Sequence, residues 1–343
     1  MPTISSLDAI ARTPLAHTPT PIEQLHNLSR HLGCGPLYVK RDDCTGLAMG
    51  GNKARQLEYY FGDALQQKAD TILITGAVQS NFARMAAAGA AKLGLACHIQ
   101  LEERVDDAGA EYHRSGNVLL DRILGAVMHA YPKGEDEAGA DAKLRVIADE
   151  LREAGKTPYI IPLAPGHPPL GALGYVRAAA EILDQLADTG NDLDEIVVAS
   201  GSGNTHAGLL FGLRSLGSAI VVIGACVRRE QALQQKRIRD RCQEIAALLQ
   251  TNSPVTPHDI RLTDNTLAPG YGRMNESTFE AIDLCARHEG LLLDPVYTGK
   301  SMAACLKRVR EAGSKDQSTL FIHTGGTPGL FGYCDQLQLP RPA

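Results

Sequence analysis

The sequence predicts an α/β protein with two open, twisted, mostly parallel sheets and flanking helices. Short apolar runs rich in β-branched residues alternate along the chain with longer segments of helical periodicity. The chain has 343 residues, of which 44% are hydrophobic, and this length suggests about two domains. The candidate strands are also too numerous for one ordinary sheet, so we expect two.

The candidate elements follow one another in regular alternation. The strands are expected at 37–40, 70–76, 96–102, 126–131, 158–163, 195–200, 219–226, 291–296 and 319–323. The helices are expected at 54–67, 81–93, 112–124, 139–154, 172–186, 205–216, 229–249, 275–288 and 300–312. Leu57, Tyr60, Phe61 and Leu65 illustrate the apolar spacing that supports the helices. The Pro- and Gly-rich segment 164–171 is the expected crossing between domains.

Composition excludes several classes of protein. The formal net charge is −5, which argues against a nucleic-acid or anionic-membrane surface as the main binding partner. No apolar run approaches the roughly 18 residues of a membrane span. Residues 1–15 contain Asp8 and lack the apolar core of a signal peptide. The eight cysteines form no CxxC pair, so we expect reduced thiols, no metal site and a cytoplasmic protein.

Four glycine-rich turns stand where chemistry gathers in parallel sheets, at the carboxyl ends of strands. The first, Gly50-Gly51-Asn52-Lys53, places a lysine at the start of a helix. A helix N-terminus disfavours a cation, so this field, together with burial, would lower the pKa of Lys53 and make its amine nucleophilic. The alternative is a solvated lysine near a turn.

The third turn has the composition of an anion cradle. It consists of Ser200, Gly201, Ser202, Gly203, Asn204 and Thr205. Its small side chains leave backbone N–H groups free to surround a phosphate at a helix N-terminus. A tight turn between strand and helix is the alternative. A reactive lysine and a phosphate cradle in an α/β chain together suggest pyridoxal 5′-phosphate as the cofactor.

The second and fourth turns are less specific by themselves. Gln79-Ser80-Asn81 opens a helix, and Ser80 and Asn81 could merely cap it. His323-Thr324-Gly325-Gly326 closes the last strand, and His323 alone is more often a core histidine than a catalyst.

Taken together, these turns resemble one enzyme family. The motifs are YVKRDD (38–43), GGNKAR (50–55), QSN (79–81), SGSGNT (200–205), APGYG (268–272), LDPVYTGK (293–300) and FIHTGG (321–326). They resemble the fold-type II pyridoxal-phosphate enzymes of the tryptophan synthase β type. Within these, they resemble the family of D-cysteine desulfhydrase and 1-aminocyclopropane-1-carboxylate deaminase. The resemblance runs from about residue 18 to residue 333.

The resemblance implies roles in binding the cofactor. Lys53 would hold it covalently and move the substrate's α-proton. Asn81 would bind the phenolic oxygen, the backbone of 201–205 the phosphate, and Thr324 the pyridine nitrogen. A hydroxyl at Thr324 would leave that nitrogen largely neutral.

The resemblance also implies roles in binding the substrate. Ser80, with Gln79 and Asn81, would bind the carboxylate, and Tyr271 and Tyr297 would face the substrate. Arg273 is a candidate cation for an anionic leaving group, or else a solvated loop residue.

Four positions distinguish this chain from members of the family. Thr298 and Thr324 stand where the ring-opening deaminases carry Glu and Leu, which favours β-elimination over ring opening. Gln56 replaces a lysine that helps to neutralise the phosphate in relatives. Phe82 replaces His or Gln beside Ser80, which puts D-cysteine itself in doubt unless Phe82 is a core residue facing away from the cofactor.

We therefore expect a large cofactor-binding domain, 1–53 and 169–343, and a small domain, 54–168, that closes over the substrate. The expected enzyme is a homodimeric lyase that converts a small amino acid to pyruvate, ammonia and the leaving group, which is sulfide for D-cysteine. Cysteate sulfo-lysis and cyclopropane opening are alternatives within the class. A catalytically silent pyridoxal-phosphate binder and a nucleotide-binding protein are alternatives outside it.

Overall fold

The computed structural model describes residues 6–134, 136–163, 166–313 and 315–337. The chain forms two compact units: unit 1 is Met1–Gln67 with Gly166–Gly325, and unit 2 is Lys68–Pro165 with Gly326–Ala343. The units differ from the predicted domains at 54–67, 166–168 and 326–343. Helix α3 (Lys53–Gln66) belongs to unit 1 because it packs against α8 (Leu173–Thr189). Helix α13 (Gly329–Gly332) belongs to unit 2 because it contacts α5 (Ala110–Arg114) and α6 (Gly116–Ile123) of that unit.

Unit 1 contains a six-stranded sheet in the order β1-β2-β10-β7-β8-β9. The strands are β1 (Ile22–Gln24), β2 (Leu37–Lys40), β7 (Glu195–Ser200), β8 (Val221–Cys226), β9 (Arg261–Thr263) and β10 (Thr319–Ile322). Only the β1–β2 pairing is antiparallel among these neighbours, so the expected mostly parallel sheet is confirmed. The carboxyl ends of β7 and β10 therefore deliver the turns at 200–205 and 323–326 to one edge.

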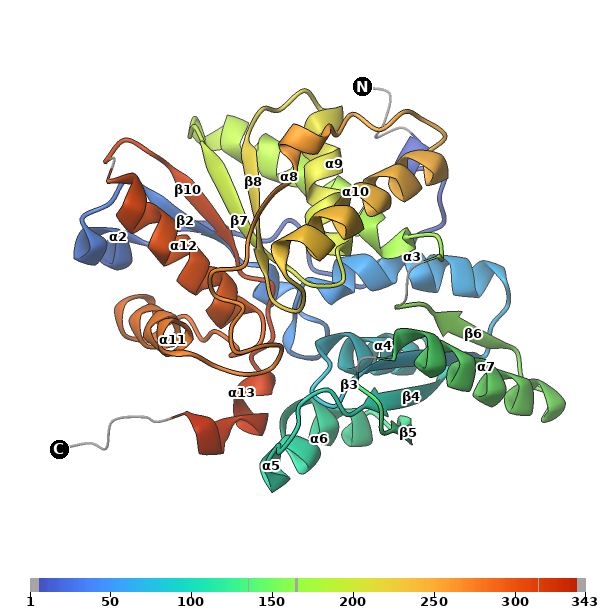
Figure 1. Ribbon diagram of the computed structural model, residues 1–343. Helices are drawn as coiled ribbons and strands as arrows, with labels where there is room; N and C mark the ends of the chain where they lie inside the picture. The colour runs from blue at the N-terminus through green and yellow to red at the C-terminus, as the bar shows by residue number, and fades with distance from the viewer. Residues whose placement is uncertain (1–5, 135, 164–165, 314, 338–343) are drawn as a thin grey trace. The chain divides into compact units, whose positions relative to one another are not determined.

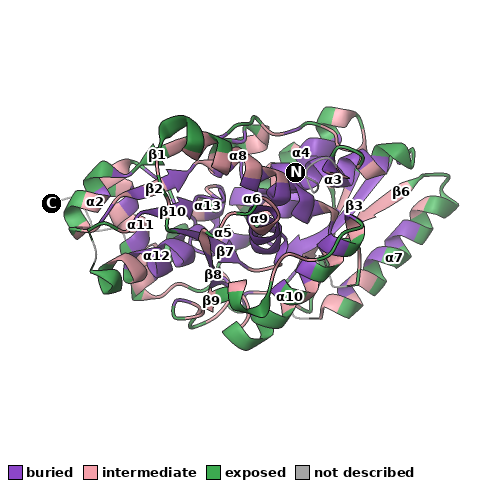
Figure 2. Ribbon diagram, turned by 90° about the horizontal axis from the view of Figure 1, so that it is seen from above, coloured by how far each residue is buried: buried purple, intermediate pink, exposed green. Residues whose placement is uncertain are grey.

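Helices cover both faces of this sheet, and each face has its own apolar core (Figure 1). On one face lie α8, α9 (Asn204–Ser215) and α10 (Gln231–Leu248), on the other α2 (His26–Leu32), α11 (Glu276–Glu289) and α12 (Thr298–Ala312). The central strands have residues buried toward both sides, and Figure 2 shows them as buried. This pattern explains the continuous apolar runs by which the strands were predicted.

Unit 2 contains a four-stranded, all-parallel sheet in the order β5-β4-β3-β6. Its strands are β3 (Thr71–Ala77), β4 (Ala96–Glu102), β5 (Val127–Tyr131) and β6 (Pro158–Ile161). Helices α4 (Asn81–Leu93) and α7 (Glu137–Glu153) pack on this sheet. Helix α4 has the predicted bounds, because Ser80 caps its start and Gly94 ends it in the left-handed conformation.

The predicted strand at 291–296 is wrong, because this segment forms no strand. Leu291 and Leu293 are buried in the core beneath α12, which explains the misleading apolar run. Pro295 lacks the N–H that a ladder needs, and Asp294 uses its carboxylate to accept the backbone N–H groups of Tyr297 and Thr298 at the start of α12. The segment is therefore a buried connection that caps a helix.

The predicted helix at 112–124 is two helices, α5 (Ala110–Arg114) and α6 (Gly116–Ile123). The chain breaks at Ser115, which is extended, and Gly116 has φ +56°. The sequence also gave no sign of α2, β1 and β9, because elements this short show no complete period.

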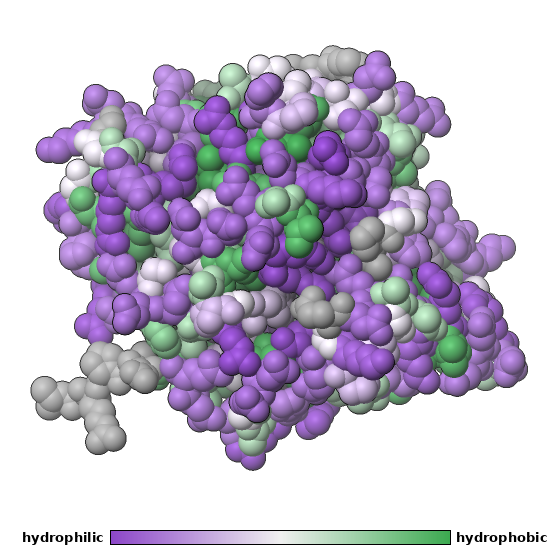
Figure 3. Space-filling model, viewed as in Figure 1, coloured by the Kyte–Doolittle hydropathy of each residue, from purple (hydrophilic) through white to green (hydrophobic). Residues whose placement is uncertain are grey.

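No described helix has the length and apolar composition needed to cross a membrane. The face in Figure 3 is mainly hydrophilic, with small separate apolar areas. Of the predicted crossing at 164–171, residues 164 and 165 lie outside the described part of the chain.

Candidate active site

The turn that carries Lys53 requires glycine at two successive positions. Gly50 and Gly51 have φ values of +67° and +130°, and a Cβ at Gly50 would collide with the Asp43 carbonyl. A Cβ at Gly325 would come within 2.6 Å of the Gly51 Cα. The Asn52 N–H donates to the Thr324 carbonyl at 2.9 Å. The first and fourth sequence-predicted turns therefore lie against each other.

Lys53 is the first residue of α3, as predicted. Burial lowers the pKa of its amine to about 8, so about a tenth of it is uncharged at pH 7, far more than for an ordinary lysine. Its Nζ approaches the Gln56 Oε1 at 3.4 Å. An amine with these properties is suited to form an imine with an aldehyde.

Thr205, at the start of α9, receives two amide donors on one oxygen. Asn52 Nδ2 and Gln56 Nε2 each donate to the Thr205 Oγ1 at 2.8 Å. Because both lone pairs of this oxygen are used, the hydroxyl proton has to point in a third direction. Gln56 thus connects Lys53 with the predicted phosphate loop.

The side chain of Ser200 is turned away from the predicted ligand. Its Oγ accepts from Gln234 Nε2 at 2.9 Å and is hydrogen-bonded to His206 Nδ1 at 3.0 Å. His206 is fully buried, and burial lowers its pKa to about 4, so the ring is neutral. Any contact of Ser200 with a ligand would have to come from its backbone.

Tyr271 and Tyr297 are brought together, as their predicted shared role requires. Their hydroxyl oxygens are 2.7 Å apart, and their rings meet edge to face. Asp294 accepts the Tyr297 N–H at 2.9 Å, and Lys300 Nζ donates to the Gly270 carbonyl at 2.9 Å. These two buried residues fix the segments that carry the tyrosines, and sequence reasoning assigned neither of them a role.

Arg273 and Thr324 differ in their surroundings. Arg273 is exposed, which is the setting of the solvated-loop alternative. Thr324 is buried, with 7% of its surface exposed, beside the turn that carries Lys53.

Unit 2 carries the other predicted residues at the start of α4. Ser80 Oγ accepts the Ala83 N–H at 3.1 Å, so the capping alternative describes one of its roles. Its hydroxyl proton remains available for a second acceptor. Asn81 Oδ1 accepts from Asn117 Nδ2 at 3.0 Å, and this orients the Asn81 amide so that its NH₂ group points elsewhere. Asn81 is thereby prepared as a donor.

The side chain of Gln79 is used inside unit 2. It donates to the carbonyls of Tyr112 and Ser115, at 2.6 and 3.0 Å, and accepts the Asn117 N–H at 2.9 Å. Gln79 therefore fills the break between α5 and α6, and only its backbone is left to contact a substrate. Asn117 is fully buried and was missed, because nothing near it in sequence points to the QSN motif.

Phe82 follows Asn81 on α4 and has 6% of its surface exposed. A ring with so little exposed surface excludes water from its surroundings.

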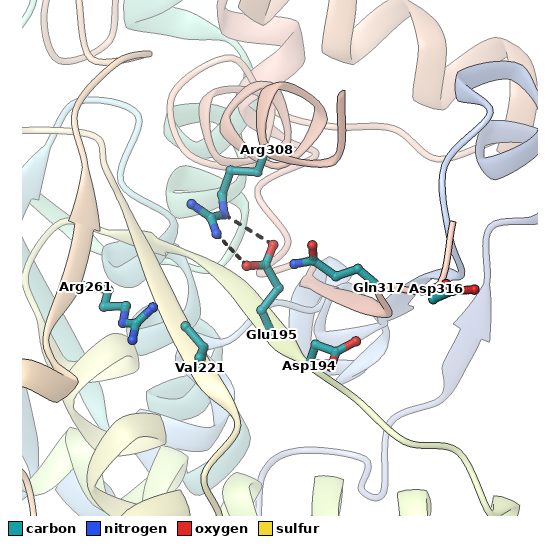
Figure 4. Close-up of a pocket in the computed structure, with 7 residues that line it drawn as sticks. All are labelled: Asp194, Glu195, Val221, Arg261, Arg308, Asp316 and Gln317. Atoms are coloured by element: carbon teal, nitrogen blue, oxygen red, sulfur yellow. Dashed lines mark hydrogen bonds and ion pairs between the residues drawn. The ribbon is translucent and has the colours of Figure 1, made fainter. Parts of the chain in front are cut away.

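A hollow of about 520 Å³ lies at the amino ends of β7 and β8, away from the predicted turns (Figure 4). Arg308 and Glu195 point toward each other across it and are joined at 2.6 Å. Since this pair satisfies its own charges, the hollow offers no obvious reactive group. Among the described residues, no group of three or more His, Cys, Asp or Glu side chains could hold a metal ion.

Comparisons with known proteins agree with this arrangement. A family model described as "Pyridoxal-phosphate dependent enzyme" matches residues 13–325. D-cysteine desulfhydrases of Salmonella choleraesuis (strain SC-B67) and Salmonella typhi are each 43% identical over 328 residues, covering 95% of this chain and 97% of theirs.

Solved structures give the same result. A structure titled "Crystal Structure Analysis of the ACC deaminase homologue" has a TM-score of 0.86 and 39% identity, with 98% of each chain covered. An O-ureido-L-serine synthase, at 19% identity, has a TM-score of 0.68 over 98% of this chain and 96% of its own, and shares the fold. The chain therefore belongs to the pyridoxal-phosphate dependent enzymes, the family that its glycine-rich turns and Lys53 predicted.

Proposed function

We propose that the protein is a lyase that eliminates the β-substituent of a small D-amino acid, with D-cysteine as the first candidate. The products from D-cysteine and water would be pyruvate, ammonia and hydrogen sulfide. The near-full-length similarity to D-cysteine desulfhydrases carries this proposal. The buried amine of Lys53, with its lowered pKa, supports it from the structure.

The residues present fit pyridoxal phosphate. Lys53 offers an amine for the aldehyde carbon, and 201–205 offers backbone donors at the start of α9 for the phosphate. Thr205 adds a hydroxyl proton whose direction is fixed by two amide donors. When bound, the cofactor withdraws electrons from the substrate's α-carbon and so makes the α-proton acidic.

The chain's own residues would do the rest. Lys53, with a pKa near 8, can take the proton from the α-carbon and then release it to the leaving group or to water, which restores the base for the next turnover. Ser80 and Asn81 would bind the substrate carboxylate through the hydroxyl proton and the oriented amide. Tyr271 and Tyr297 would face the substrate as a pair, because their hydroxyl oxygens are 2.7 Å apart.

A second candidate is opening of the cyclopropane amino acid, because a structure similar to this chain is titled an ACC deaminase homologue. Thr298 argues against it. The resemblance places Glu at this position in the ring-opening deaminases. Here the Thr298 Oγ1 accepts the Asp294 N–H at 2.7 Å, within the turn that leads into α12. Cysteate remains a candidate through Arg273, which is exposed.

The test is a panel of specificity constants for D-cysteine, L-cysteine, D-serine, 3-chloro-D-alanine, L-cysteate and the cyclopropane amino acid. We expect pyruvate from D-amino acids that carry a β-leaving group and no 2-oxobutanoate from the cyclopropane. Release of 2-oxobutanoate with no pyruvate from D-cysteine would contradict the proposal.

Phe82→His adds a polar group beside Ser80 and should raise kcat/KM for D-cysteine about tenfold relative to the other substrates. Phe82→Leu, which stays apolar, is the matched control and should leave the ranking unchanged. An unchanged ranking in both variants would make Phe82 a packing residue.

We further propose that the enzyme is a homodimer of the cytoplasm. The proposed dimer rests on the family resemblance alone. The compartment is supported by the cysteines: all eight lie in the described part of the chain as free thiols, the state that a reducing compartment maintains.

A further inference from the structure

The loop after β7 is held from behind by side chains on α10 and just before it. Gly201 O accepts from Gln234 Nε2 at 3.1 Å and from Arg229 Nη1 at 3.2 Å. Ser202 O accepts from Arg237 Nε at 3.1 Å. Two successive carbonyls of the predicted phosphate loop are therefore fixed by three long polar side chains.

The flanking carbonyls of the loop are engaged by the backbone. Ser200 O accepts the Val227 N–H at 3.2 Å, and Gly203 O accepts the Ala207 N–H at 2.8 Å. Each of the four carbonyls from 200 to 203 thus has a donor.

Peptide geometry converts this arrangement into a direction for the N–H groups. In a planar trans peptide, the carbonyl of one residue and the N–H of the next point in opposite directions. The N–H groups of Ser202 and Gly203 therefore point away from the donors on α10. Gly203, with φ +100°, lies directly on this helix, since a Cβ there would be 3.5 Å from the Cγ atoms of Arg237 and Arg241.

The same contacts bring positive charge to the loop at 200–205. The family resemblance implies a lysine near this loop at position 56, and this chain has Gln56 there. Gln56 is neutral and donates to Thr205. Arg237 is charged at all relevant pH values and binds the carbonyl of the peptide whose N–H belongs to Gly203. A charged donor on a carbonyl polarises the peptide and strengthens the hydrogen bond that its N–H can give.

We infer that Arg237 is a positioning residue for the cofactor phosphate, and that Gln234 and Arg229 assist it by holding Gly201. The phosphate is then bound by backbone N–H groups whose direction and polarity are set from α10. This inference rests on the proposed assignment of 201–205 as the phosphate site and deepens it.

The test compares two cofactor analogues on the full-length chain after removal of bound cofactor. Pyridoxal 5′-phosphate and pyridoxal, which lacks the phosphate, are titrated against wild type and Arg237→Gln, with visible absorbance as the readout. We expect Arg237→Gln to weaken binding of the phosphate form about tenfold, the size expected for a hydrogen bond from a charged donor. Binding of pyridoxal should not change.

Lys236→Gln is the matched control on the same helix. Lys236 is exposed and pairs with Asp240 at 2.6 Å. Its substitution removes one positive charge, as Arg237→Gln does. It should leave both affinities unchanged. In a competition experiment with wild type, inorganic phosphate should displace pyridoxal 5′-phosphate at a lower phosphate concentration than it needs to displace pyridoxal.

Two results would overturn the inference. If Arg237→Gln binds the phosphate form as tightly as wild type, α10 does not set the loop. If it weakens pyridoxal as much as the phosphate form, Arg237 supports the fold and not the phosphate. A different result would show that 201–205 is not the phosphate site. Valine at position 203 is strained, because Gly203 has φ +100°, so Gly203→Val should weaken binding of the phosphate form. Full affinity in Gly203→Val would mean that the phosphate binds elsewhere.

Discussion

Among the buried or partly buried lysines, Lys53 differs in its partners. Lys40 Nζ is bound by the Glu181 carboxylate at 2.6 Å, which favours its charged form although burial lowers its pKa. Lys300 also has its pKa lowered by burial, to about 8, but its amine donates to the carbonyls of Leu267 and Gly270. Lys53 Nζ contacts Gln56 at the longer distance of 3.4 Å. Its position at the start of α3 and its lowered pKa fit it for the role of nucleophile.

Borohydride reduction of the holoenzyme followed by peptide mapping should therefore place the cofactor on Lys53. The reduced imine resists hydrolysis, so the label survives digestion and identifies the residue. Lys53→Ala should lose the visible absorbance band of the covalently bound cofactor. Lys300→Met is the comparison variant and should keep this band. A label on Lys40 or Lys300 would refute the assignment.

At the scale of elements, β4 and β5 are joined by a pair of histidines as well as by their ladder. His98 Nδ1 and His129 Nε2 are 3.0 Å apart, so one ring donates and the other accepts. Burial lowers the pKa of both rings. The charge of His129 lowers the pKa of His98 further, and the charge of Lys143 lowers the pKa of His129 further. Strand β5 is an edge strand, so this contact helps to hold it in the sheet.

The pair predicts a loss of stability in mild acid. Because the folded pKa values lie below the unfolded value of about 6.5, the unfolded chain binds more protons in this window. Stability should be complete above that value and should fall as pH falls through the window toward the folded pKa values. Thermal melting between pH 8 and pH 5 should show this slope in wild type and a smaller one in His129→Asn. His26→Gln, at an exposed position, should keep the wild-type slope, and an identical slope in His129→Asn would contradict the prediction.

At the scale of the whole chain, a buried ionic network joins distant parts of unit 1. Arg55 on α3 pairs with Asp42 at 2.9 Å and with Glu181 on α8 at 2.8 Å, and Lys40 on β2 joins them. Burial would raise the pKa of Glu181, but the hydrogen bond and charge of Arg55, with the charge of Lys40, lower it to about 2. The network thus fixes the helix that begins at Lys53 to the sheet.

Glu181→Gln should therefore destabilise the protein by about 3 kcal/mol at pH 7, because it leaves buried cations short of one counter-charge. The deficit should be complete above the ordinary glutamate pKa and should shrink as pH falls toward 2, since wild-type Glu181 then becomes protonated. Urea midpoints at several pH values measure it. Glu111→Gln, which removes a half-buried surface carboxylate paired with the exposed Arg114, should change the midpoint little. An equal effect of both variants would show that the network adds no stability.

The sequence predicted most elements because their signals are local. Helix α4 has its cap and its terminal glycine within or beside the helix, and its bounds were predicted without error. The segment 291–296 was mistaken for a strand because apolar residues mark a buried connection as well as a strand. The helix at 112–124 was divided by Gln79, more than thirty residues away, whose amide occupies the break.

The sequence by itself determined the family and the glycine-rich turns, and it predicted Lys53 as the reactive lysine. Each of these depends on a few adjacent residues and on backbone conformations that glycine permits. Tertiary structure alone decided what holds those turns. Asn117 reaches Asn81 across 36 positions, Gln56 reaches Thr205 across 149, and Arg237 reaches Ser202 across 35. These donors lie on other elements, where they meet their acceptors only after the sheets and helices have packed. A hydrogen bond between distant residues leaves no periodicity in the chain, so only the folded structure could reveal it.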